Sequence, residues 1–177
     1  MEASERERSR IQRRFGVTFL AVAGLLFAAY AFPYQQHGVS EAWFKGYLAA
    51  YARLVGAVLG LFDSNVMVAG TLIRGRMTLE IVKACDAMEV NILFVSAVVA
   101  FPAPWLRKLA ALGGGLIALL ALNVLRIVSL YYIGVGSPDW FEPMHLDVWP
   151  LVLVVLTATL FLLLARWMQS HEAPDGG

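Results

Sequence analysis

The sequence has a single cysteine, three histidines and few charged residues, which make up 15% of its 177 positions. One cysteine excludes an internal disulfide and any metal site built from cysteine pairs, and leaves either an inert buried thiol or a reactive one. The net charge is +1 and no basic face is apparent, so no nucleic-acid partner is expected. No metal or cofactor signature is present, because His37 and His171 stand alone in polar segments where we expect them to be solvated.

Apolar residues are abundant and make up 59% of the chain. Soluble domains have roughly half, so a lipid bilayer is the expected solvent. We predict an all-α integral membrane protein in which residues 1–177 form a single membrane domain. Its expected parts are about four transmembrane helices, an interfacial amphipathic helix and a small extracytoplasmic β-hairpin.

Four apolar segments approach the ~20 residues that a helix needs to cross the hydrocarbon core. They cover residues 15–32, 86–101, 109–133 and 146–167. A basic tail, residues 1–14, precedes the first segment. No small-residue cleavage site follows that apolar segment, so we predict that it is retained as a membrane anchor and not removed as a signal peptide. Residues 168–177 are predicted to form a polar tail. The glycines at 113–115 either let a neighbouring backbone approach closely or only weaken the helix locally.

The segment between the first two spans contains two further predicted elements. Residues 41–62 are predicted to form a helix, which Lys45 and Arg53 place at the membrane interface rather than across the bilayer. Residues 66–83 alternate apolar and polar side chains around Arg74-Gly75-Arg76, which predicts a hairpin. Because an open sheet edge cannot face lipid, this hairpin is expected at the interface or against the protein.

Positive charges predict the orientation in the membrane. Five arginines precede the first span and Arg107 and Lys108 lie between the second and third, whereas residues 134–144 contain none, so both termini are expected in the cytoplasm. The positive charges between the first two spans conflict with this orientation. Long structured segments obey the rule poorly, and we keep the prediction.

Three residues with chemical potential fall on the same side of the membrane in this topology. Cys85 precedes the second span, His145 opens the fourth, and Arg126 lies in the outer part of the third. Arg126 is seven residues before Ile133, about 10 Å from the helix end at ~1.5 Å per residue, and its long side chain can reach the interface.

Arg126 is the strongest physical indication of function. An arginine within a span costs roughly 2.5–3.5 kcal/mol on insertion scales, so intramembrane charges usually face the protein interior and mark functional sites. Asn123, Arg126 and Ser129 recur every three residues and form a polar stripe. Arg126 alone could instead extend to outer headgroups, Cys85 alone could be a small buried hydrophobe, and His145 alone could be an interfacial residue.

Together the three side chains could carry out acyl transfer. A cysteine attacks a carbonyl as its thiolate, which a nearby cation stabilises, and a histidine can accept and return a proton near neutral pH. An arginine can bind the oxyanion of the tetrahedral intermediate or position the peptide through paired donors. The product of the first step would be a thioester.

Three ordered motifs resemble the exosortase/archaeosortase family, and most closely the exosortase H type. They are Val82-Lys83-Ala84-Cys85, Asn123-Val124-Leu125-Arg126-Ile127 and Met144-His145-Leu146, and the similarity covers roughly residues 45–165. The resemblance implies a cysteine transpeptidase that cleaves a carboxy-terminal sorting signal of the PEP-CTERM-like kind, made of a short motif, a transmembrane helix and a basic cluster. It implies Cys85 as nucleophile, His145 as general acid/base and Arg126 as transition-state stabiliser.

The resemblance also implies partners and a location. The partners would be exported proteins with the sorting signal, the lipid bilayer and an unidentified acceptor, with no cofactor. The location would be the bacterial inner membrane, with several spans and an active site that faces the periplasm. A non-catalytic scaffold of an envelope or exopolysaccharide assembly is the main alternative, and a channel or transporter that uses Arg126 for an anion is a third.

The residues after the cysteine depart from the family pattern. Many members continue with a small polar residue and glycine, whereas this chain has Cys85-Asp86-Ala87-Met88-Glu89. Two acids oppose thiolate formation by like-charge repulsion unless nearby cations compensate. We hypothesise that Asp86 or Glu89 pairs with Arg126 or orients His145, as the third member of a triad does. Asp86 could equally cap the helix of the second span.

Overall fold

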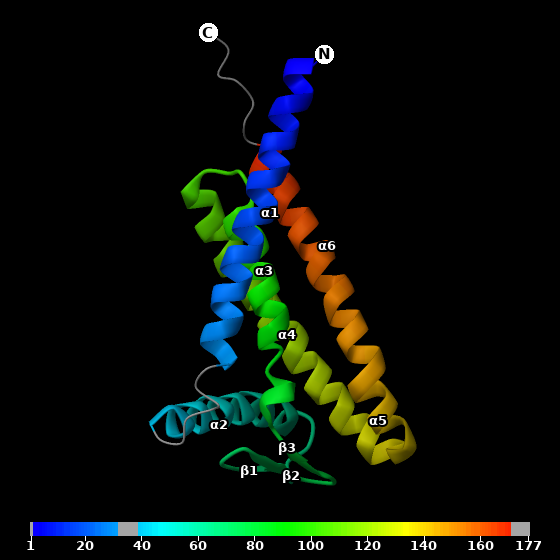
Figure 1. Ribbon diagram of the computed structural model, residues 1–177. Helices are drawn as coiled ribbons and strands as arrows, with labels where there is room; N and C mark the ends of the chain where they lie inside the picture. The colour runs from blue at the N-terminus through cyan, green and yellow to red at the C-terminus, as the bar shows by residue number, and fades with distance from the viewer. Residues whose placement is uncertain (1, 32–38, 171–177) are drawn as a thin grey trace. The chain divides into compact units, whose positions relative to one another are not determined.

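The computed structural model of the protein describes residues 2–31 and 39–170 (Figure 1). His37, His171 and residues 171–177 of the predicted polar tail lie outside this range. The long helices are α1 (Glu2–Ala31), α2 (Val39–Gly60), α3 (Met88–Ala100), α4 (Trp105–Gly136) and α6 (Trp149–Ser170). Between α4 and α6 the chain forms a 3-10 turn (Pro138–Trp140), the short helix α5 (Phe141–Pro143) and a π-helical turn (Met144–Val148).

Three described helices are long and apolar enough to cross a membrane, and they are Arg6–Ala31, Trp105–Gly136 and Pro138–Ser170. The apolar helix α3 is shorter, because its 13 residues extend about 20 Å at ~1.5 Å per residue. A hydrocarbon core is ~30 Å thick. The predicted class, a helical integral membrane protein, is confirmed. The interfacial placement of α2, which is not among the three long spans, stays a prediction.

The second predicted span begins later than expected, at Met88 instead of Asp86. The preceding residues Lys83–Cys85 form a 3-10 turn, and Ala87 has a φ of 53°, in the left-handed region. A residue in this conformation cannot continue a right-handed helix, so α3 starts after it.

The elements fall into two groups, which we describe separately; that the chain forms one membrane domain stays a prediction. The first group consists of Met1–Tyr30, Glu89–Leu119 and Val155–Gly177. In it, the rings of Phe101 and Phe161 meet edge to face at 5.9 Å, which joins the end of α3 to α6. Arg107 Nη1 donates to the carbonyl of Met168 over 2.7 Å and joins the start of α4 to the end of α6.

The glycine run on α4 receives an aromatic side chain. A Cβ at Gly115 would collide with the ring of Phe94 on α3, whereas a Cβ at Gly113 or Gly114 would have no neighbour within 4 Å in the rest of the described chain. A close approach therefore occurs at Gly115 alone, and the approaching group is a ring, not the neighbouring backbone of the first alternative.

The second group consists of Ala31–Met88 and Leu120–Val154, and contains α2 and the sheet. Buried residues recur every three or four positions along α2, as expected for an amphipathic helix. They are Leu48, Tyr51, Ala52, Val55 and Leu59. This stripe packs in one core with Ile73, Leu79 and Ile81 of the sheet region and with Ile127 and Tyr131 of α4. The sheet lies against α2 (Figure 1).

The sheet has three antiparallel strands in the order β1 (Met67–Ala69), β2 (Leu72–Arg74) and β3 (Thr78–Glu80). The sequence predicted a two-stranded hairpin around Arg74-Gly75-Arg76, which corresponds to β2 and β3. A second, tighter turn at Gly70, with a φ of 63°, adds β1. Glycine adopts this left-handed conformation without a steric penalty.

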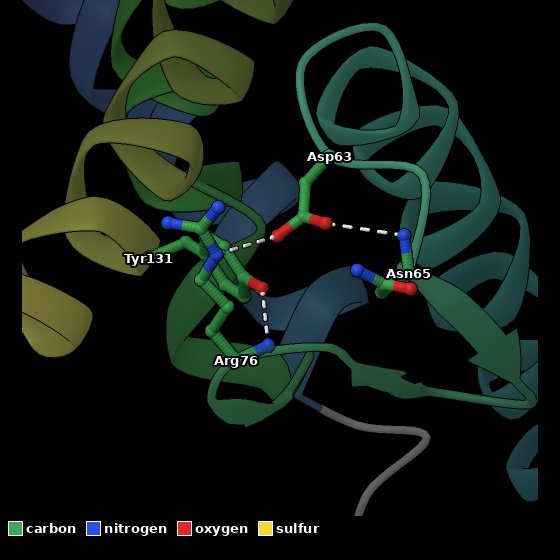
Figure 2. A network of polar contacts seen from close by, with 4 residues as sticks. All are labelled: Asp63, Asn65, Arg76 and Tyr131. Carbon is green, nitrogen blue, oxygen red and sulfur yellow. Dashed lines mark hydrogen bonds and ion pairs between the residues drawn. The ribbon is translucent and has the colours of Figure 1, made fainter.

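A polar network fixes the turn between β2 and β3 (Figure 2). Tyr131 of α4 accepts a hydrogen bond from the backbone N–H of Arg76 at 2.9 Å. Asp63, buried after α2, forms a 3.2 Å ion pair with Arg76 and accepts a hydrogen bond from the backbone N–H of Asn65. A Cβ at Gly75 would overlap the Tyr131 hydroxyl, so only glycine fits here without rearrangement. The turn is thereby held against α4.

Candidate active site

Cys85 ends the 3-10 turn that leads from the sheet to α3. Its backbone N–H donates to the carbonyl of Val82 at 2.8 Å, and its side chain is a free thiol, buried at 7% exposure. The left-handed residue Ala87 follows two positions later. Backbone conformations of this kind cost energy and cluster at functional sites. The thiol is thus presented from a sharply turned segment between two elements.

Asn123 of α4 holds the turn that contains Cys85 by a hydrogen bond. Its buried Nδ2 donates to the carbonyl oxygen of Cys85 at 2.7 Å and to the hydroxyl of Tyr51 at 2.8 Å. Because both partners are oxygens at the same nitrogen, the orientation of the amide is determined by the contacts. Burial raises the pKa of Tyr51 to about 12, and the hydrogen bond from Asn123 opposes this rise. The phenol therefore stays protonated at neutral pH.

Tyr51 is a site residue that the sequence reasoning missed. The only local feature of Tyr51 is its position on the apolar stripe of α2, and this position predicts a core residue and not a site residue. Its contact with Asn123 spans 72 positions of the chain, which no local periodicity encodes.

Arg126 is buried at 5% exposure, one turn of α4 beyond Asn123. Its Nη2 lies 3.4 Å from Nδ1 of His145 and 3.5 Å from the carbonyl oxygen of the same residue. Its Nε has no hydrogen-bond partner within residues 39–170. Ser129, the third member of the predicted polar stripe, donates to the carbonyl of Arg126 at 2.7 Å. The guanidinium thus keeps an unused donor inside the protein.

His145 lies on the π-helical turn Met144–Val148 and is half-buried. Its ring stacks on Phe141, with ring centres 5.8 Å apart and planes 15° from parallel. The contact with Arg126 is a hydrogen bond only when Nδ1 is the acceptor, which places the imidazole proton on Nε2. At 3.4 Å this hydrogen bond is long. Single π-helical turns are frequent at functional sites.

Cys85, Arg126 and His145 line one cavity of about 260 Å³, entirely within the second group of elements. The three side chains come from the turn before α3, from α4 and from the π-helical turn. The rest of the lining is supplied by Met77, Thr78, Leu79, Glu80, Val82, Ile127, Leu130 and Phe141. The cavity combines a thiol, a cation and an imidazole with walls that are apolar apart from Thr78 and Glu80.

The two acids after the cysteine have different environments. Asp86 is buried, and its Oδ1 accepts the backbone N–H of Met88 at 2.9 Å, which is the capping alternative for this residue. Glu89 is exposed on the first turn of α3, belongs to the first group and does not line the cavity. That either acid pairs with Arg126 or orients His145 stays a prediction.

The cavity has the composition of a site for nucleophilic acyl transfer. It brings together a nucleophile, a proton acceptor and a cationic hydrogen-bond donor, which acyl transfer through a covalent intermediate requires. Among the described residues, no group of three or more His, Cys, Asp or Glu side chains could hold a metal ion.

These features define a helical membrane protein with a thiol, a guanidinium and an imidazole in one cavity. A family model described as transmembrane exosortase (Exosortase_EpsH) matches residues 12–163, most of the chain. The chain therefore belongs to the transmembrane exosortase family. Membership implies a transpeptidase that acts on substrates with a sorting signal. No curated protein and no solved structure matches the chain.

Proposed function

We propose that this exosortase is a cysteine transpeptidase that cleaves a carboxy-terminal sorting signal from exported proteins. In this proposal Cys85 is the nucleophile, His145 the general acid/base and Arg126 the transition-state stabiliser. The single observation that carries the proposal is the shared cavity, because three residues 41 and 19 positions apart line the same 260 Å³ space.

The first half-reaction forms a thioester. His145 releases its long contact with Arg126, and its unprotonated nitrogen, Nδ1, takes the proton of the Cys85 thiol. The sulfur then attacks the scissile carbonyl carbon, so that the carbonyl oxygen becomes an oxyanion. The guanidinium of Arg126, which lines the cavity, can donate hydrogen bonds to this oxyanion. The C–N bond then breaks, and His145 returns the proton to the leaving amine of the transmembrane tail.

The second half-reaction releases the product. An acceptor nucleophile, or water, gives a proton to His145 and attacks the thioester. The C–S bond then breaks, and the Cys85 sulfur takes the proton back from His145. The asparagine that holds the Cys85 carbonyl acts as a positioning residue.

The processing of a co-produced substrate tests this proposal. A tagged exported protein with a carboxy-terminal motif, transmembrane helix and basic cluster should be shortened or ligated by the wild type. It should stay at full length with Cys85→Ala, although that variant is produced at the same level. Processing by Cys85→Ala at the wild-type rate would remove the cysteine from the mechanism. The scaffold alternative instead predicts that the wild type leaves the substrate at full length and that Cys85→Ala still captures its partner.

We further propose that the cavity opens on the periplasmic face of the bacterial inner membrane. The loop from 134 to 144, which leads to His145, has no positive charge, as expected for an outer loop. Because Cys85 is the only thiol, a membrane-impermeant maleimide of small size reports its side directly. We expect labelling of intact spheroplasts from outside, abolished by Cys85→Ala. Labelling only after the inner face is exposed would reverse the topology.

A further inference from the structure

The strand β3 has a free edge. The sheet order makes β3 the terminal strand, with β2 on one side only. Two hydrogen bonds flank β3, from Ile81 N–H to the Thr71 carbonyl and from Gly75 N–H to the Met77 carbonyl, and they show that the backbone groups of Met77 and Ile81 face β2. Because such pairs alternate in an antiparallel ladder, the N–H and C=O groups of Thr78 and Glu80 point away from β2.

These outward groups are open to a ligand. Within residues 39–170, no backbone hydrogen bond joins Thr78 or Glu80 to a segment on the outer side of β3. Their side chains are exposed, whereas Leu79 and Ile81 are buried on the other face of the strand. An unpaired strand edge is a template for pairing with another extended chain.

The free edge is continuous with the candidate active site. The cavity is lined by four consecutive residues, Met77 to Glu80, and then by Val82. Successive side chains of a strand point to opposite faces, so a cavity above one face would be lined by alternate residues only. Consecutive lining residues indicate that the cavity meets the strand from its side. The same cavity contains Cys85.

We propose that the outer edge of β3 binds the substrate around its scissile bond as an added β-strand. This inference rests on the proposed function, because it assigns the substrate-binding element of the same cavity. The occupant is the extended segment of the exported protein that immediately precedes its transmembrane helix. Peptide groups of Thr78 and Glu80 bond the substrate backbone, and the cavity walls select its side chains, as in other cases of strand addition.

Strand addition explains how a short motif can be placed for attack. Backbone hydrogen bonds fix the register of an extended peptide independently of its side chains, so the scissile carbonyl is held at a constant distance along the strand. The bonds also remove the cost of unpaired backbone groups of enzyme and substrate near the bilayer.

Disulfide mapping tests the proposal without catalysis. The enzyme carries Cys85→Ala and Glu80→Cys. The substrate is the tagged protein of the processing test, with one cysteine in the segment before its transmembrane helix. This cysteine is moved through the segment one residue at a time. Cβ atoms of directly opposed residues lie roughly 4.5–5.5 Å apart and those of diagonal neighbours roughly 7–8 Å apart. Disulfides should therefore form most strongly at one substrate position, weakly two positions to either side, and not at the positions between. With Thr78→Cys instead, the pattern should shift by two positions, in a direction that gives the strand polarity.

Arg74→Cys provides the matched control. Arg74 is exposed and pairs with Thr78 from the inner side, so β3 separates it from the substrate strand and no periodic disulfides should form. Three disulfide patterns would each overturn the proposal: crosslinks at all substrate positions, crosslinks that recur every three to four positions, and no crosslink at all. Equal crosslinking with Arg74→Cys would overturn it too. Disulfide-linked enzyme dimers of Glu80→Cys in place of the substrate product would assign the edge to a second copy and overturn it as well.

A backbone variant gives a second measurement. Glu80→Pro removes an outward N–H that makes no bond to β2, whereas Glu80→Gln keeps it. We expect Glu80→Pro to lower processing about tenfold relative to Glu80→Gln, the equivalent of one ~1.4 kcal/mol interaction. Equal processing by both variants would contradict strand addition. A wild type that processes no substrate would instead defeat the proposed function, while the disulfide pattern is read independently in the Cys85→Ala enzyme.

Discussion

Replacement of Asn123 by alanine is the sharpest test of how the protein holds its cysteine. Asn123 is buried, and its amide donates to the Cys85 carbonyl and to the Tyr51 hydroxyl. Asn123→Ala leaves two buried oxygens without this donor, and each such loss costs about 1–3 kcal/mol. The unfolding temperature in detergent should fall by about 4 °C or more, at about 2–4 °C per kcal/mol for a chain of this size.

Tyr51→Phe is the matched control, because it removes one of the two hydrogen bonds and leaves the bond to Cys85. The loss of one hydrogen bond costs about 0.5–1.5 kcal/mol, so we expect a fall of about 1–6 °C, smaller than for Asn123→Ala. The processing assay separates the two variants further. Asn123→Ala should lower the turnover number with little change in the substrate concentration at half-maximal rate, while Tyr51→Phe should process nearly as the wild type. Wild-type turnover by Asn123→Ala, or a larger defect in Tyr51→Phe, would refute the positioning role.

Three further variants test other parts of the structure. Arg126→Lys keeps the charge but loses the planar fork, so processing should fall at least tenfold with unchanged membrane abundance, and undiminished turnover would leave a structural role. Ala87→Gly should raise the free energy of unfolding by about 1 kcal/mol, because Ala87 is left-handed, and a lower unfolding temperature would contradict that conformation. Gly75→Ala should destabilise the wild type more than it destabilises Tyr131→Phe, which lacks the hydroxyl that the new Cβ would meet; strictly additive unfolding temperatures would contradict this contact.

Local patterns in the sequence predicted most of the helices. The apolar segments gave three long helices and a shorter one, and the stripe on α2 follows the spacing of an amphipathic helix. The helix α3 starts two residues after the beginning of the predicted span, because Asp86 and Ala87 form a turn that no hydrophobic period reveals. The third strand was missed because it depends on the conformation of a single glycine, Gly70.

Long-range contacts in the site were less accessible to sequence reasoning. The family motifs drew attention to Cys85, Arg126 and His145, and charge within an apolar span independently marked Arg126. The network of Asn123, Tyr51 and the Cys85 carbonyl joins α2, α4 and the turn before α3, and such a network is defined only when these elements pack together. The same holds for the free edge of β3, since only the sheet order shows which strand is terminal.

A covalent intermediate on Cys85 tests the central claim most directly. Wild-type enzyme mixed with the tagged substrate and quenched in acid should contain a peptide in which the Cys85 sulfur is joined to the carboxyl end of the cleaved substrate. The mass of this adduct should disappear after treatment with neutral hydroxylamine, which cleaves thioesters, and the adduct should be absent from Cys85→Ala. Cleaved substrate that accumulates with no thioester on Cys85, at quench times shorter than one turnover, would contradict the account.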